Sequence, residues 1–247
     1  MDSSFELVYI NLDDRVDKRE VTEINLTEYG LGGKNFKRFS AVREVDIPAL
    51  GCSKSHYMAI ANFVVYSKKE FVFIIEDDWR FSVQISEIER YVELLYRNNP
   101  EFKVLLLSAT DALSSDNGII KLDERVNAVP ILKSTSTAAY VLNRKYALEL
   151  NSIFSKSIER IARNSKEIVD INRDYYSKNG NKDKDVVSKK VAVNVLTALD
   201  HVWGELSING GFYSLNYRVG FCDELSSDIS GYSINNADRQ FAKKRAI

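Results

Sequence analysis

The chain has 247 residues, of which 45% are hydrophobic, and its formal net charge is −1. A chain of this length and apolar content can bury a substantial core and fits one large α/β domain. A charge so close to zero argues against a dedicated nucleic-acid binder. Two cysteines are too few for a disulfide framework. Because the sequence shows neither a signal-peptide pattern nor the roughly 20 apolar residues of a spanning helix, we expect a soluble, cytoplasmic protein.

A basic turn follows the first predicted strand. Residues 7–12 (LVYINL) form an apolar run, and the residues after it include Arg15, Lys18 and Arg19. A basic turn directly after a buried strand can clamp a diphosphate or contact a nucleotide. The same residues would also serve as an ordinary solvated helix start, capped by an aspartate. A helix is expected over residues 21–29, with Gly30 ending it.

The second predicted strand, residues 36–42, leads into a longer helix. Ser53 is a candidate N-cap, which would put Ser55 and His56 in the first helical turn. Free backbone N–H groups at a helix start favour anions and disfavour protonation of an imidazole. We therefore expect a neutral, hydrogen-bonding His56 near a bound anion. A histidine that only orders a loop is an equally acceptable interpretation.

Five apolar residues at positions 71–75 run directly into Glu76, Asp77 and Asp78. Such a run is typical of a strand buried on both faces of an α/β sheet, and ligands bind past the carboxyl ends of such strands. Buried acids need a partner, and a divalent cation shared with phosphates would supply one. On an extended backbone Glu76 and Asp78 point the same way and Asp77 points to the other side. The alternative is an acidic strand end with only capping and salt-bridge roles.

The middle of the chain carries further elements. Ser86 and Glu89 have the spacing of a capping box and predict a helix start, followed by an apolar stripe. The other expected elements are a strand at 103–107, a loop or irregular hairpin at 108–127, a strand at 135–142 and a helix at 144–154.

The C-terminal third is heavily charged between residues 155 and 190. Helix is expected up to about Asp174, an exposed loop at 177–185, a strand at 191–196, and one or two strands at 212–222. Asp200 and His201 are adjacent in a chain with only two histidines. This pair is a candidate general base or a source of a third metal ligand. The alternative is a helix-capping aspartate beside a surface histidine.

Six motifs in order resemble those of glycosyltransferase family 25. They are YINLDDRVDKR, LGCSKSHYMAI, FIIEDDW, STAAYVLNRKYA, ALDHVW and LSSDIS. This family includes bacterial lipooligosaccharide galactosyltransferases and collagen galactosyltransferases, and similar domains occur in large DNA viruses. Because the motifs are spread over most of the chain, the resemblance is more specific than any one of them.

The resemblance implies a GT-A glycosyltransferase fold, a Rossmann-like mixed α/β sheet flanked by helices, over residues 1–247, with a charged insertion around 155–190. It implies metal-dependent transfer of a hexose, galactose or glucose, from a UDP-sugar to a hydroxyl of a glycan or glycoprotein, with inversion. The implied cofactor is Mn²⁺ or Mg²⁺. By this resemblance the catalytic residues are Asp200 and His201, and the metal ligands are Asp78, Glu76 and His201. The residues implied to line the donor site are Asn11, Leu12, Arg15, Arg19, Ser55, His56, Glu76 and Asp77.

Two other functions are compatible with parts of the same pattern. Phosphatases of the haloacid-dehalogenase type also end a buried strand with acids, but they need Asp-x-Asp with an aspartate first, and here Glu76 stands first. The other is a non-catalytic module that binds a nucleotide-sugar or glycan on the same fold, but the retained acids, both histidines and the basic turn argue against loss of the catalytic site.

Overall fold

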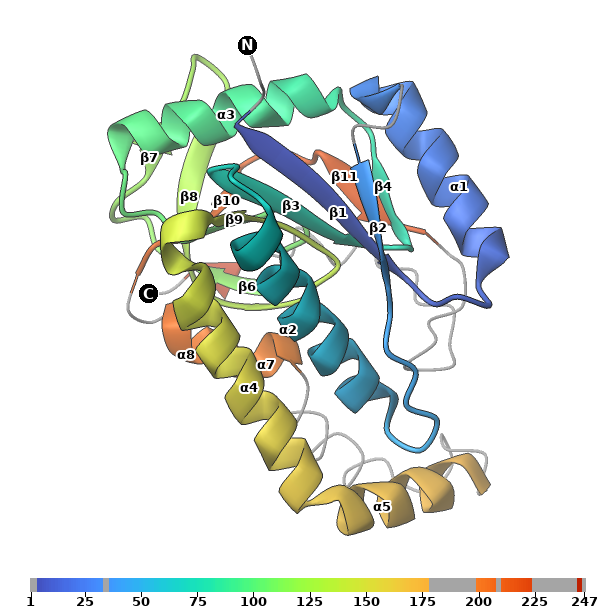
Figure 1. Cartoon of the computed structure of the whole chain (residues 1–247). Coiled ribbons are helices and arrows are strands. Elements are labelled where there is room, and N and C mark those ends of the chain that lie inside the picture. The colour runs from blue at the N-terminus through green and yellow to red at the C-terminus, as the bar shows by residue number, and fades with distance from the viewer. Residues whose placement is uncertain (1–3, 33–35, 178–198, 208–209, 224–243, 246–247) are drawn as a thin grey trace.

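The computed structural model describes residues 4–32, 36–177, 199–207, 210–223 and 244–245. Within these residues ten strands form one mixed sheet (Figure 1). In spatial order they are β12 (Lys244–Arg245), β6 (Thr110–Ser114), β8 (Asn127–Thr135), β10 (Phe212–Leu215), β5 (Val104–Leu106), β9 (Ala139–Asn143), β3 (Phe71–Glu76), β1 (Phe5–Asn11) and β2 (Phe36–Ser40), with β7 (Ile120–Lys121) paired to β8. A separate two-stranded sheet pairs β4 (Trp79–Phe81) with β11 (Gly220–Cys222).

Helices cover both faces of the large sheet. They are α1 (Val16–Leu26), α2 (Pro48–Tyr66), α3 (Ile85–Asn98), α4 (Ala147–Arg163), α5 (Ser165–Ser177), α7 (Leu199–Val202) and α8 (Gly204–Ser207), with a π-helical turn at Thr27–Leu31 and a 3₁₀ turn at Arg144–Tyr146. Helices α2 and α4 run alongside each other on one face (Figure 1). The expected α/β fold, a Rossmann-like mixed sheet flanked by helices, is thereby confirmed.

The alternation of side chains along β1 and β3 explains why these strands are apolar throughout. Leu7 and Phe73 pack into a cluster with α3, whereas Val8 and Ile74 pack into a second cluster with α2 and α4. Successive side chains of a strand point to opposite faces, so a strand covered by helices on both sides must be apolar at every position.

Two helices begin earlier than the sequence predicts. Helix α1 begins at Val16 rather than near residue 21, and α2 begins at Pro48 rather than after Ser53. Proline suits the first turn of a helix because its missing N–H would have no intrahelical partner there. Gly51 lies inside α2, where a Cβ would come within 2.5 Å of the Val42 backbone oxygen. The preceding loop therefore packs directly on the first turns of α2.

The predicted capping box is wrong. Helix α3 begins at Ile85 after Gln84, without a side-chain cap, and Ser86 lies inside it. The predicted apolar stripe is correct, since Ile88 and Leu95 are fully buried.

The strand β8 was not predicted from the sequence. It contains Pro130, and proline inside a run argues against a central strand because it lacks an N–H donor. Strands β6 and β7 lie within the segment expected as a loop or irregular hairpin.

Near the C-terminus, the predicted strands at 212–222 are present as β10 and β11. Helix α4 continues to Arg163, and α5 then extends to Ser177. The strand predicted at 191–196 and most of the loop predicted at 177–185 lie outside the described residues, as does the closing LSSDIS motif. None of the helices that the structure describes has both the length and the hydropathy needed to cross a bilayer.

Candidate active site

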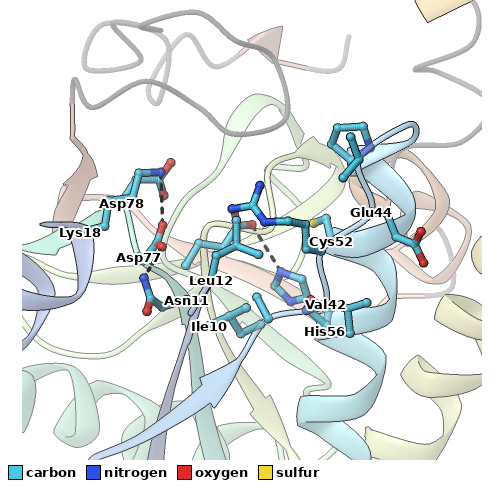
Figure 2. Close-up of a pocket in the computed structure, with 16 residues that line it drawn as sticks. Ile10, Asn11, Leu12, Lys18, Val42, Glu44, Cys52, His56, Asp77 and Asp78 are labelled. Atoms are coloured by element: carbon cyan, nitrogen blue, oxygen red, sulfur yellow. Dashed lines mark hydrogen bonds and ion pairs between the residues drawn. The ribbon is translucent and has the colours of Figure 1, made fainter. Parts of the chain in front are cut away.

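A cavity of about 210 Å³ opens at the carboxyl ends of β1 and β3 (Figure 2). These strands are parallel neighbours, and β2 pairs in parallel with the other side of β1. Their carboxyl ends therefore meet at one edge, which is where open α/β sheets bind ligands. The lining residues are Ile10, Asn11, Leu12, Lys18, Ala41, Val42, Arg43, Glu44, Val45, Pro48, Cys52, Ser55, His56, Glu76, Asp77 and Asp78.

All three consecutive acids line this cavity. Strand β3 ends at Glu76, and Asp77 and Asp78 form the turn that leads into β4. Because Asp77 and Asp78 lie in a turn, the alternation expected of an extended backbone does not continue past Glu76.

Asp77 is held by two buried partners. Asn11 Nδ2 donates a hydrogen bond of 2.8 Å to Asp77 Oδ2, and Lys18 Nζ lies 3.4 Å from Oδ1. Burial raises the pKa of Asp77, and the charge of Lys18 partly offsets that rise. Lys18 itself is only 2% exposed. The sequence places Lys18 in the basic turn but does not single it out, since its burial depends on where α1 packs.

Asn11 is fixed from several sides. Its Nδ2 also donates to the Arg15 backbone oxygen, and its Oδ1 accepts from Arg19 Nε at 3.3 Å and Arg38 Nε at 3.0 Å. Every donor and acceptor of this buried amide is used, so its orientation toward Asp77 is defined.

Asp78 carries a buried oxygen that has no hydrogen-bond partner among the described residues, Oδ1. Burial and the nearby charge of Glu76 raise the pKa of Asp78 to about 7. A buried acceptor left unpaired costs about 1–3 kcal/mol, and more when it is charged. A proton or a cation at this oxygen would remove that penalty.

His56 and Glu76 form the opposite part of the site. His56 Nδ1 lies 3.1 Å from the Tyr140 hydroxyl, and Nε2 lies 3.4 Å from Glu76 Oε1 without an aligned hydrogen bond. Thr137 Oγ1 donates a hydrogen bond of 2.8 Å to the same oxygen. Burial acts to raise the pKa of Glu76, but His56 and the Thr137 hydroxyl outweigh it, and the pKa is lowered.

Ser55 and His56 do not lie in the first helical turn. Because α2 begins at Pro48, both residues are in its interior, and the predicted anion site at a helix start is not formed by them. Ser55 Oγ donates to the Gly51 backbone oxygen and accepts from the Val42 backbone N–H. Ser55 thus ties the loop before α2 to the helix.

Of the remaining predicted site residues whose side chains the structure describes, only Leu12 is among the cavity-lining residues, and Arg15 and Arg19 are not. Arg15 pairs with Asp17 at 2.9 Å. Asp200 and His201 lie in α7, and their side chains are outside those that the structure describes.

Cys52 completes a group that sequence reasoning did not assemble. The ligand atoms of Cys52, His56 and Glu76 all lie within 4.8 Å of one another. Cys52 and His56 are four residues apart, a spacing that puts two side chains on one face of a helix. That spacing was a usable signal, although the position of Glu76 beside it depends on the packing of α2 against the sheet.

No protein-family model and no curated protein sequence matches the chain. Among solved structures, it is similar to a glycosyltransferase involved in the glycosylation of the major capsid of PBCV-1, with 10% identity and a TM-score of 0.39 over 61% of this chain and 65% of that one. It is also similar to the WbbM bifunctional glycosyltransferase, with 12% identity and a TM-score of 0.36 over 64% of this chain and 34% of that one. A third similar structure is the glycosyltransferase GlyE of Streptococcus pneumoniae, with 10% identity and a TM-score of 0.35 over 85% of this chain and 45% of that one. The matches span from about a third to just under two thirds of those proteins.

Proposed function

We propose that the chain is a glycosyltransferase that moves a hexose, galactose or glucose, from a UDP-sugar to a hydroxyl group of a glycan or glycoprotein, with inversion. The observation that carries this proposal is the convergence of three separate motifs on one cavity. Asn11 and Leu12 come from the first motif, Ser55 and His56 from the second, and the three acids from the third. These are the motifs by which the sequence resembles glycosyltransferase family 25.

The donor-side residues fit a divalent cation, Mn²⁺ or Mg²⁺. Such ions bind through one or two carboxylates together with substrate phosphates, rather than through an all-protein cage. The unpaired Oδ1 of Asp78 is the acceptor best suited to this role. Glu76 and His201 are the further proposed ligands. When bound, the cation would stabilise the negative charge that develops on the departing UDP.

The chain's own residues would bind and orient the donor. Lys18 lies within the cavity lining beside Asp77, where its ammonium group can also attract a diphosphate. Asn11 holds Asp77 in place. Asp200 would take the proton of the acceptor hydroxyl as that oxygen attacks the anomeric carbon and the bond to UDP breaks, with His201 beside it.

A thermal-shift panel tests the donor. UDP-glucose, UDP-galactose and UDP are each added with Mn²⁺ or with EDTA. A ligand at 100 times its Kd stabilises the native state by about 2.7 kcal/mol, which corresponds to a rise in Tm of roughly 5–10 °C for a chain of this size. We expect a shift with Mn²⁺ that EDTA and Asp78→Ala both abolish. Full transfer activity in Asp78→Ala would end the proposal.

Turnover is measured by UDP release with and without a panel of acceptor glycans. Asp200→Asn should keep donor binding and lose transfer, because the substitution removes a base and not a ligand of the diphosphate. A UDP-sugar that stabilises the protein but is never turned over would instead support the non-catalytic binding module.

A further inference from the structure

We propose that Cys52, His56 and Glu76 form a second metal site, which shares Glu76 with the proposed donor-side cation, for Zn²⁺ or a chemically similar cation such as Co²⁺ or Fe²⁺. Figure 2 shows Cys52 and His56 along α2 on one side of the cavity, with Asp77, Asp78 and Lys18 on the other. This inference rests on the geometry of these three residues and does not depend on the proposed sugar transfer.

The spacing of the three ligand atoms suits a tetrahedral ion. With Zn–N and Zn–O bonds of about 2.0–2.2 Å, two ligands at a tetrahedral angle lie about 3.4 Å apart. His56 Nε2 and Glu76 Oε1 are 3.4 Å apart. With a Zn–S bond of about 2.3 Å, the sulfur would lie about 3.6 Å from either atom. Each of the three side chains brings one ligand atom within 4.8 Å of the other two, so the three side chains need to close by only about 1 Å to reach these separations.

His56 carries the observation that points to a ligand. The side chain is 1% exposed, and its Nε2 lies 3.4 Å from Glu76 Oε1 without an aligned hydrogen bond to that oxygen or to any other atom of the described residues. A buried imidazole nitrogen is normally paired, because leaving it unpaired costs about 1–3 kcal/mol. Coordination of a cation would satisfy the lone pair of Nε2.

The surrounding residues already orient the ligands as metal sites require. The Tyr140 hydroxyl contacts His56 Nδ1 and can accept its proton in a hydrogen bond, which leaves the lone pair on Nε2. Thr137 donates to Glu76 Oε1 and fixes that carboxylate. Outer partners of this kind hold the ligand rings and carboxylates of protein metal sites in place.

The ligand set selects the class of cation. Cysteine thiolate and imidazole suit Zn²⁺ and similar transition metals, whereas Mg²⁺ and Mn²⁺ prefer carboxylate, carbonyl and water oxygens. Cys52 would bind as the thiolate, releasing its proton to solvent, and His56 would bind in the neutral form. Three protein ligands leave a fourth position, and sites of this kind give it to water or to an oxygen of a bound molecule. The cavity lies next to all three ligands.

A Co²⁺ titration of the chelator-treated protein tests the site directly. A thiolate bound to Co²⁺ gives a near-ultraviolet charge-transfer band, and tetrahedral Co²⁺ gives visible bands. We expect one equivalent of Co²⁺ to produce both, and Zn²⁺ to displace it. Cys52→Ser should remove the charge-transfer band. His56→Gln should remove the tetrahedral spectrum, with circular dichroism used to confirm that each variant is folded.

Two matched variants serve as controls. Cys222→Ser removes the other cysteine, which lies in β11, and should leave the spectrum unchanged. Asp78→Asn should also leave it unchanged, although the proposed function expects that variant to lose Mn²⁺-dependent donor binding.

The inference is overturned if the wild-type protein gives no charge-transfer band, whatever the variants do. It is equally overturned if the band survives Cys52→Ser or disappears in Cys222→Ser. Either result would leave the Mn²⁺-dependent shift with UDP-sugars untouched, so failure of this site and failure of the proposed function are distinguishable.

Discussion

Replacement of Asp78 by Asn should stabilise the protein at alkaline pH. The side chain keeps its size, and the substitution removes a negative charge from a half-buried side chain whose Oδ1 is buried, beside Glu76. In the native state the pKa of Asp78 is raised from 3.8 to about 7, chiefly by burial. One pKa unit corresponds to about 1.4 kcal/mol, so the ionised carboxylate lowers the free energy of unfolding by up to about 4 kcal/mol.

The sign of the pH dependence follows from the direction of this shift. Below about pH 4 the carboxyl group is protonated in both the native and the unfolded state, and Asp78 carries no penalty. Between about pH 4 and pH 7 the native state holds a proton that the unfolded state has lost, so the stability of the wild type falls as the pH rises. The advantage of Asp78→Asn should therefore be near zero at pH 4 and complete by pH 8.

Urea unfolding in EDTA at pH 4.5, 6 and 8 measures this advantage. Asp116→Asn, at an exposed position, is the matched control and should change the free energy of unfolding by no more than about 0.5 kcal/mol. The reasoning is refuted if Asp78→Asn fails to stabilise the protein at pH 8. It is also refuted if the gain is the same at all three pH values. Stabilisation coupled to loss of Mn²⁺-dependent donor binding would mark Asp78 as a residue kept for function.

Two further substitutions test the contacts around the site, one at the buried Lys18–Asp77 pair and one in the β4–β11 pair. Lys18→Met should lower the free energy of unfolding by about 3–5 kcal/mol at pH 8, because it leaves the buried Asp77 carboxylate without its cation. Lys37→Met, at an exposed position, is the control and should cost less than about 1 kcal/mol. Equal losses in urea unfolding would contradict a buried role for Lys18. Gly220→Ala should cost roughly 1–3 kcal/mol, since its Cβ would come within 2.3 Å of a β4 backbone oxygen, while Gly32→Ala has open space and should be nearly neutral in thermal unfolding. A neutral Gly220→Ala would mean that the β4–β11 pair is not held this closely.

Local patterns in the sequence identified the strands that build the site. The apolar run before Glu76 predicts a strand buried on both faces, and β3 is such a strand. Ligands bind past the carboxyl ends of strands in open α/β sheets, and the cavity lies at the carboxyl end of β3. Patterns of two or three residues were less informative, as the failed capping box at Ser86 shows. Such short signals are overridden when tertiary packing fixes where a helix begins.

The sequence by itself determined the α/β class, the main apolar strands and the position of the acids after β3, because these depend on which residues must leave water. Only the tertiary structure decided which side chains meet those acids. Lys18 reaches Asp77 from α1, which begins at Val16, and Cys52 and His56 reach Glu76 from α2, which begins at Pro48 and packs on the sheet over β1 and β2. Strand order and the packing of helices on the sheet are fixed by burial of the whole sheet, although a local residue such as Pro48 can favour where a helix begins. The chemistry of the cavity therefore depends on contacts between segments that no local pattern encodes.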